Sequence, residues 1–138
     1  MTLSVHHLDN EQGIVFLCRG ILHGQELINA LAEMPLSKAF KTLKYALIDE
    51  TGVESIKITS KDVYDIVKYH RSLAVSLTED AVVAIIAPST LGYGLGRMWE
   101  ALADDIGWVT KVFKTKNEAT EWVKVKMGKI HKIDVKFE

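Results

Sequence analysis

The residues best suited to chemistry lie in one turn between Pro88 and Arg97. An apolar run stops at Pro88, a Ser-Thr pair follows, and three glycines then occupy alternate positions. A helix beginning here would offer free backbone N–H groups, two hydroxyls and the positive end of its dipole, all of which favour negative charge. Arg97 could close such a site as a bidentate donor. The pattern predicts a binding site at this helix start, formed by Ser89, Thr90, Tyr93, Gly94 and Arg97.

A plainer interpretation of the same turn stays open. Ser89 or Thr90 could only cap the helix, the glycines could only permit close helix–sheet packing, and Arg97 could pair with Glu100 on the helix surface. The glycine spacing also departs from G-x-G-x-x-G and from the phosphate-binding loop that ends in Gly-Lys-Ser/Thr. We therefore expect no nucleotide and no other cofactor.

Two further segments could contribute to a site. Asp49 follows a short apolar strand, and ligands of α/β proteins bind at the carboxyl ends of strands. Its alternative role is to cap a loop through backbone N–H groups. Thr59 and Ser60 stand where the next helix begins.

No catalytic constellation or metal site is apparent. The lone Cys18 sits in an apolar run and is expected to be an inert buried thiol. The five histidines do not converge in the sequence, and no Cys-x-x-Cys motif occurs. We therefore expect a protein that is not an enzyme.

The elements that position these residues alternate in type. Apolar runs and helical spacing predict the order β-β-α-β-α-β-α-β-α. Two segments, 20–24 and 50–58, are predicted to be loops, and Asn117 is predicted to cap the last helix. The predicted strands span 3–8, 14–19, 45–48, 82–87 and 108–113. The first helix is predicted over 25–34, and the apolar stripes of the other three run from 63 to 74, from 95 to 106 and from 119 to 127. This order indicates an α/β fold with a small, mostly parallel sheet, four helices and an N-terminal β-hairpin.

Residues 1–138 are expected to form one domain. In the tail, 129–138, the spacing of Ile133, Val135 and Phe137 has strand period, which predicts a strand that pairs with the sheet edge or with a second copy. The N-terminus has no apolar signal core, and no run approaches the roughly 20 apolar residues of a membrane span. We expect a cytoplasmic protein without stable membrane insertion.

Charge is balanced overall but unevenly distributed. The net charge is −1, and residues 111–138 hold eight lysines against four acidic residues. This basic segment lacks the arginine and aromatic interleaving of a nucleic-acid surface, so no nucleic-acid partner is expected.

The second half of the chain resembles the STAS-like family, specifically its SpoIIAA-like group, which borders on the CRAL-TRIO (Sec14-like) lipid-binding fold. The resemblance rests on three stretches, and it extends to the first half only through element order. The pattern is similar to that of small bacterial proteins of this group. The stretches are Ala84 to Pro88, Tyr93 to Glu100, and Val112-Phe113 with Glu118 to Val123.

The resemblance implies a regulatory module that docks a protein partner or a small anionic or amphipathic ligand, as a homodimer. Relatives that antagonise anti-sigma factors carry a phosphorylated serine in an Asp-Ser-Gly-like turn. Here Thr59 and Ser60 hold that place without the motif, and Asp62 would repel a phosphate. The alternative function is a CRAL-TRIO-like carrier whose apolar pocket would be lined by Leu95, Met98, Trp99 and Trp122.

Overall fold

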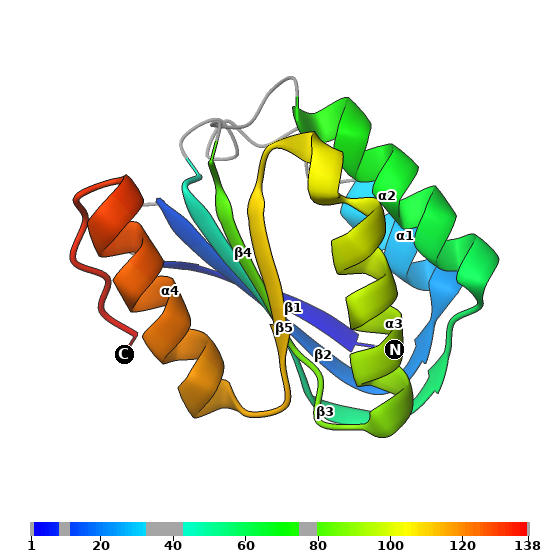
Figure 1. Ribbon diagram of the computed structural model, residues 1–138. Coiled ribbons are helices and arrows are strands. Elements are labelled where there is room, and N and C mark those ends of the chain that lie inside the picture. The colour runs from blue at the N-terminus through cyan, green and yellow to red at the C-terminus, as the bar shows by residue number, and fades with distance from the viewer. Residues whose placement is uncertain (1, 9–11, 33–42, 75–79, 138) are drawn as a thin grey trace.

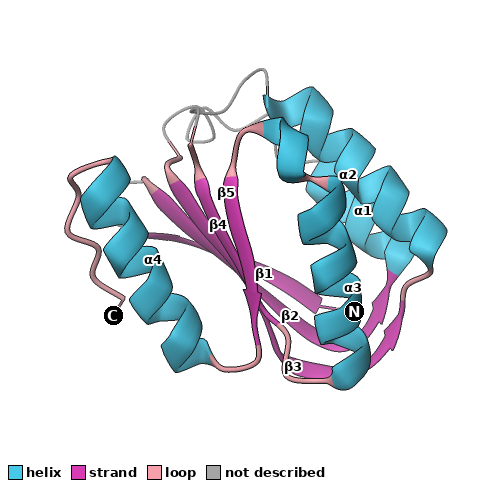
Figure 2. Cartoon of the chain, viewed as in Figure 1, coloured by secondary structure: helices cyan, strands magenta, loops and turns pink. Residues whose placement is uncertain are grey.

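The computed structural model describes residues 2–8, 12–32, 43–74 and 80–137. A five-stranded sheet lies between helices on both of its faces (Figures 1 and 2), which confirms the predicted α/β class and element order. The strands are β1 (Thr2–Leu8), β2 (Gly13–His23), β3 (Tyr45–Lys57), β4 (Val82–Ile86) and β5 (Val109–Phe113). The helices are α1 (Gly24–Ala32), α2 (Ser60–Ala74), α3 (Thr90–Leu102), the short η3 (Asp104–Ile106) and α4 (Lys116–Ile130).

The strands lie in the sheet in the order in which they occur in the chain, β1-β2-β3-β4-β5. β1 and β2 form the predicted antiparallel hairpin, and every later neighbouring pair is parallel. Crossovers of one hand that advance steadily across a sheet place their helices on one face. Accordingly α1, α2 and α3 cover one face, and α4, which follows the last strand, covers the other (Figure 1).

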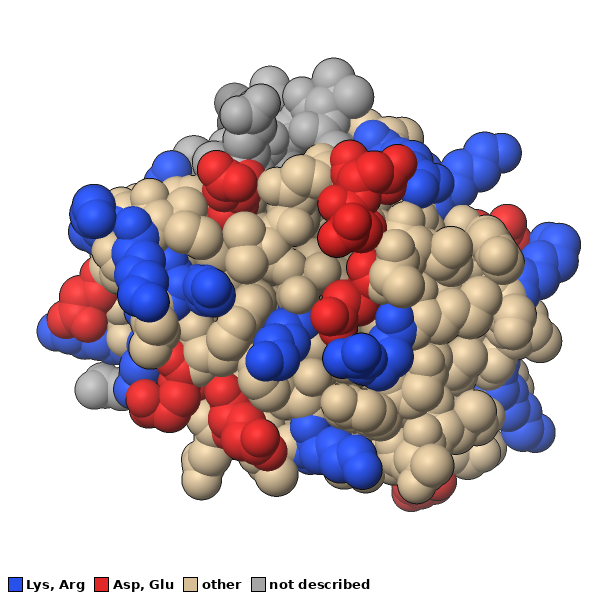
Figure 3. Space-filling model, viewed as in Figure 1, with Lys and Arg blue, Asp and Glu red and all other residues tan. Residues whose placement is uncertain are grey.

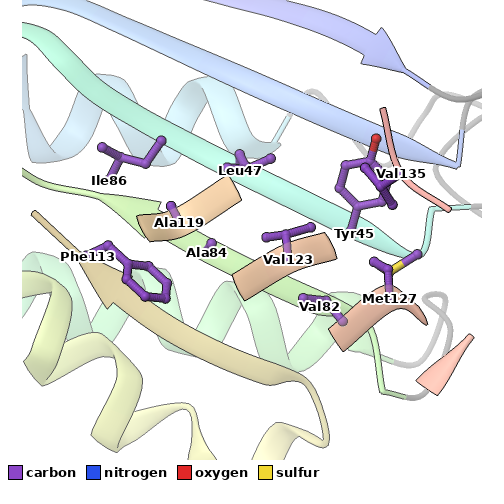
Figure 4. Packing of buried hydrophobic residues seen from close by; sticks show 10 residues of the cluster. All are labelled: Tyr45, Leu47, Val82, Ala84, Ile86, Phe113, Ala119, Val123, Met127 and Val135. Atoms are coloured by element: carbon purple, nitrogen blue, oxygen red, sulfur yellow. The ribbon is translucent and has the colours of Figure 1, made fainter. Parts of the chain in front are cut away.

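Strand alternation divides the apolar residues into two cores. On the α4 face, Tyr45 and Leu47 of β3 pack with Val123 and Met127 of α4 (Figure 4). On the opposite face, Val83 and Ile85 of β4 pack beneath α2 and α3. All five residues of β4 are buried, as expected of a central parallel strand covered on both faces.

The predictions of loops at 20–24 and 50–58 are wrong, because β2 continues to His23 and β3 to Lys57. β2 and β3 continue there as paired parallel strands, beyond the point where β4 stops pairing with β3. Register shifts near Cys18 and Gly20 break the alternation by which a strand is recognised, and Gly20 adopts a φ of +79°. This two-stranded extension carries the chain to the start of α2.

Two smaller predictions also need correction. Thr115, not Asn117, caps α4: its hydroxyl accepts from the Glu118 backbone N–H and donates to the Glu118 carboxylate. Residues 132–137 form no strand with the sheet of their own chain, and Val135 instead packs in the α4-face core beside Tyr45; pairing with a second copy stays a prediction. The tail contributes one layer of packing and leaves the sheet edge unpaired. Residues 33–42, which include the end of the first predicted helix at Met34, lie outside the described residues.

Candidate functional site

The hydroxyl of Ser89 caps α3. It accepts from the Gly92 backbone N–H at 2.9 Å, and the Ser89 carbonyl accepts from the Tyr93 N–H at 2.9 Å. Ser89 has the extended backbone of an N-cap, with φ −78° and ψ 152°. One of the donors expected to meet a ligand is therefore satisfied within the helix. Thr90 follows as the first helical residue, and its side chain is exposed.

The three glycines of the turn have different surroundings. A Cβ on Gly96 would lie 2.7 Å from Val112 Cγ2, so this glycine lets α3 approach β5 closely. A Cβ on Gly92 would lie 2.8 Å from Ile56 Cδ1 and 3.0 Å from Glu50 Oε1. Gly94 has open space around its Cα. Close packing thus accounts for two of the glycines and leaves Gly94 on the surface.

Arg97 is exposed and forms no ion pair with another described residue. The suggested pairing with Glu100 is not present, because the Glu100 carboxylate accepts from the Val112 backbone N–H at 3.3 Å. Tyr93 is half-buried, with the Lys114 ammonium 5.1 Å from its ring centroid. Arg97 therefore remains available to a partner, and Lys114 adds a second positive charge beside the same helix.

Asp49 and Glu50 point to opposite faces of the sheet. Asp49 is buried on the α4 face with Leu47, and its Oδ1 accepts from the Thr51 N–H at 2.9 Å and the Thr51 hydroxyl at 2.7 Å. It lies inside β3, not at the end of a strand, because β3 continues to Lys57. These bonds match the alternative role of Asp49 as a local cap for the backbone.

Glu50 is the site residue that the sequence reasoning missed. It lies on the face covered by α1 to α3, and its Oε1 stands against Gly92 in the first turn of α3. Burial, with a smaller contribution from the Asp49 carboxylate, raises the pKa of Glu50 from 4.5 to about 7. The carboxyl therefore titrates near neutral pH at the place where an anion was expected to bind.

The start of α2 is also closed by its own residues. The Thr59 hydroxyl accepts from the Asp62 N–H at 3.1 Å, and the Asp62 carboxylate accepts from the Thr59 N–H at 2.8 Å. This reciprocal pair is a capping box. Thr59 and Ser60 are both exposed. They follow directly after the extension of β3, which ends at Lys57 and whose Ile56 packs against Gly92, so the starts of α2 and α3 lie at the same edge of the sheet.

A cavity of about 150 Å³ lies between the sheet and helices α1, α2 and α3. Its lining is mostly apolar, and its ionisable members are Cys18, Tyr45, Glu50 and His70. Burial, together with the Glu50 and Asp49 carboxylates, raises the pKa of the Cys18 thiol to about 12. Cys18 is thus the inert buried thiol that was expected.

His70 is held as a neutral ring within this layer. Its Nδ1 accepts from the Trp99 indole N–H at 2.9 Å, and burial lowers the pKa of His70 from 6.5 to about 4. The ring also stacks edge-on against Trp99 and lies tilted beside Trp108. A neutral imidazole bonded at Nδ1 carries its proton on Nε2.

The four residues suggested for a lipid pocket do not come together. Leu95 and Trp99 line the cavity, and Met98 packs against the same core. Trp122 lies on the opposite face of the sheet, against Phe113 in the α4-face core. The apolar faces of α3 and α4 pack on opposite faces of the sheet, so the sheet separates Trp99 from Trp122.

Charges on the visible face are interleaved and form no broad region of one sign (Figure 3). Within the described ranges no three His, Cys, Asp or Glu side chains are grouped so that they could hold a metal ion. None of the helices in the described part of the chain is long and apolar enough to cross a membrane.

Comparisons with known proteins identify the fold. No protein-family model matches the sequence, and no curated protein matches it significantly. An uncharacterised protein of the DUF3478 family from Shewanella loihica PV-4, described as having a SpoIIAA-like fold, is 22% identical, with a TM-score of 0.52 over 88% of this chain and 91% of that one. The anti-sigma factor antagonist SpoIIAA, in its unphosphorylated form, is 13% identical, with a TM-score of 0.51 over 88% and 97%. The chain therefore has the SpoIIAA-like fold that the resemblance implied.

Proposed function

We propose that the chain is a non-enzymatic regulatory module of STAS type that docks a protein partner at the starts of α2 and α3. The observation that carries this proposal is the likeness of the fold to SpoIIAA, an anti-sigma factor antagonist, and the exposed surface it leaves at the start of α3, where Leu91 is 54% exposed. Around it the same helix presents exposed Thr90, Gly94 and Arg97. A single exposed apolar residue is ordinary on a protein surface, but arginine is enriched at interfaces, and Arg97 on the same helix is exposed without an ion pair to a described residue.

A protein partner suits this surface better than a small anion. Glu50 stands against the first turn of α3, and Asp62 occupies the capping position at the start of α2. Both carboxylates oppose a second negative charge at the helix ends. Ser89 already uses its hydroxyl to cap α3. A broad contact over Leu91 and Arg97 does not require these inward groups.

The fold comparison supports regulation by protein contact. SpoIIAA is an anti-sigma factor antagonist, and its likeness to this chain extends over 88% of the residues. Phosphorylation is not part of our proposal, because Thr59 bonds to Asp62 and the carboxylate would repel a phosphate.

Three related predictions belong to the same proposal. We infer a cytoplasmic protein that binds no nucleic acid, consistent with the interleaved charges on the face shown in Figure 3. We also infer a homodimer, for which β1, at the edge of the sheet, offers unpaired backbone groups. Light scattering after size exclusion would give the mass of this assembly, and a monomer at all concentrations would contradict the dimer.

Site-specific photocrosslinking tests the docking surface. A photoreactive amino acid would replace Leu91 in one variant and Val125 in another; these residues are 54% and 50% exposed and lie on α3 and α4 respectively. In cells that express the protein, we expect a discrete adduct from position 91 and none from position 125. Adding Arg97→Glu should abolish the adduct. Equal labelling from both positions, or none from position 91, would overturn the proposal.

A further inference from the structure

The cavity beneath α1 to α3 is separate from the proposed docking surface. It lies between three helices and the sheet and is partly open to solvent, and Ile48, Ile85, Leu95 and Trp99 are among its apolar walls. Its volume, about 150 Å³, is that of an engineered apolar cavity known to take up benzene. A site of this size accommodates one six-membered ring.

Glu50 is the group in the cavity wall that lacks a partner. Cys18 is a neutral thiol, and His70 is bonded to Trp99. Tyr45 also has its own interactions. Among the described residues Glu50 makes no hydrogen bond and no ion pair. The Glu50 side chain is half-buried, so in the free protein its carboxyl is left to water, and a ligand with a hydrogen-bonding group could take the place of that water.

The chemistry around Glu50 selects the ligand's polar group. A carboxylate would be repelled by Glu50 and by Asp49, whose charge already acts on Glu50. An ammonium group would have to be desolvated among apolar walls, at high cost. A hydroxyl can donate to the ionised carboxylate and can both donate to and accept from the protonated acid.

We propose that this cavity binds a neutral single-ring molecule with one hydroxyl group, its ring between Ile48, Ile85 and Trp99 and its hydroxyl on the Glu50 carboxyl. The inference does not depend on the docking surface, because it concerns a different set of atoms and a different class of ligand. It also differs from a lipid carrier, because the proposed ligand is a single ring held by a hydroxyl on Glu50, with no acyl chain.

Three ring compounds of similar size test the proposal at pH 7: phenol, toluene and benzoate. The indole N–H resonances provide an internal control, because Trp99 and Trp108 line the cavity and Trp122 lies on the other face of the sheet. We expect saturable shifts of the first two resonances with phenol, weaker binding of toluene and no binding of benzoate. A uniform shift that includes Trp122, tighter binding of benzoate than of phenol, or no saturable shift would overturn the proposal.

Substitutions distinguish the contribution of the cavity to binding from that of the Glu50 carboxyl. Ala46 lines the cavity, so Ala46→Leu should abolish binding of phenol and toluene, whereas Ala101→Leu, on the exposed face of α3, should not. Glu50→Leu should reduce phenol affinity about tenfold, the loss of one hydrogen bond, and leave toluene affinity unchanged. Each variant is first checked for a native NMR spectrum. If folded Glu50→Leu keeps the preference for phenol, Glu50 does not bind the hydroxyl.

Discussion

Replacing Glu50 with glutamine should stabilise the protein, and by an amount that depends on pH. The pKa of Glu50 is raised from 4.5 to about 7, mainly by burial. The folded protein therefore binds this proton more tightly than the unfolded chain does. Stability contributed by the protonated acid is present below pH 4.5 and is lost as the pH rises through 7. Glutamine keeps the shape and cannot ionise.

The size of the effect follows from the two pKa values. The linkage relation gives a destabilisation of wild type relative to Glu50→Gln of about 1 kcal/mol at pH 5 and about 3 kcal/mol at pH 8. Because the side chain is only partly buried, contact with water reduces the value at pH 8 to about 2 kcal/mol. The variant should therefore be more stable than wild type at pH 8 and close to it at pH 5.

Urea denaturation of both proteins at several pH values measures this difference. The difference matters more than the wild-type curve, because His70, with its pKa lowered to about 4, contributes the opposite slope over much of the same range. Glu54→Gln is the matched control, since Glu54 is exposed on the same strand. A gap between wild type and Glu50→Gln that stays constant from pH 5 to pH 8 would refute the reasoning.

Three other predictions concern particular contacts, each measured by urea denaturation. Gly96→Ala should cost about 1–2 kcal/mol, because its Cβ would lie 2.7 Å from Val112 Cγ2, while Gly94→Ala, in open space, should stabilise α3 by up to about 1 kcal/mol; equal effects would contradict the packing. Thr115→Ala should cost about 1 kcal/mol and Asn117→Ala almost nothing, and the reverse order would restore Asn117 as the cap. His70→Asn should lower the free energy of unfolding at pH 7.5. On acidification to pH 5 the variant should lose less stability than wild type, because protonating His70 costs wild type about 2 kcal/mol. Stability curves of the two proteins that run parallel with pH would exclude a neutral buried His70.

The sequence predicted the elements whose signals are local. The run Val82 to Ala87 reads as a buried strand because both faces of β4 are covered, and the helices follow from apolar residues at helical spacing. The extension of β3 to Lys57 was missed because its only partner is β2, across two register shifts. Strand pairing across a bulge depends on the partner strand, so the hydrophobic alternation within one strand does not predict it.

The site was predicted only where a side chain acts on its own neighbours in the chain. Ser89 caps α3, as one of the two interpretations required, because an N-cap is bonded three residues ahead. Glu50 was overlooked because residues 50–58 were predicted to be a loop, in which a side chain has no assigned face of the sheet. Only the length of β3, which keeps Glu50 within a pleated strand, turns its side chain toward α3 and away from Asp49.

Glu50 joins the interior of the protein to its proposed docking surface. The same carboxyl lines the cavity and touches Gly92, one residue from the exposed Leu91. The N-terminal turn of a helix is sensitive to nearby charge, so protonating Glu50 or bonding it to a hydroxyl changes the field at the start of α3. If both proposals hold, a ligand in the cavity alters partner affinity, and reciprocity requires the partner to alter ligand affinity by the same factor. Such coupling should disappear in Glu50→Gln, whose charge is fixed.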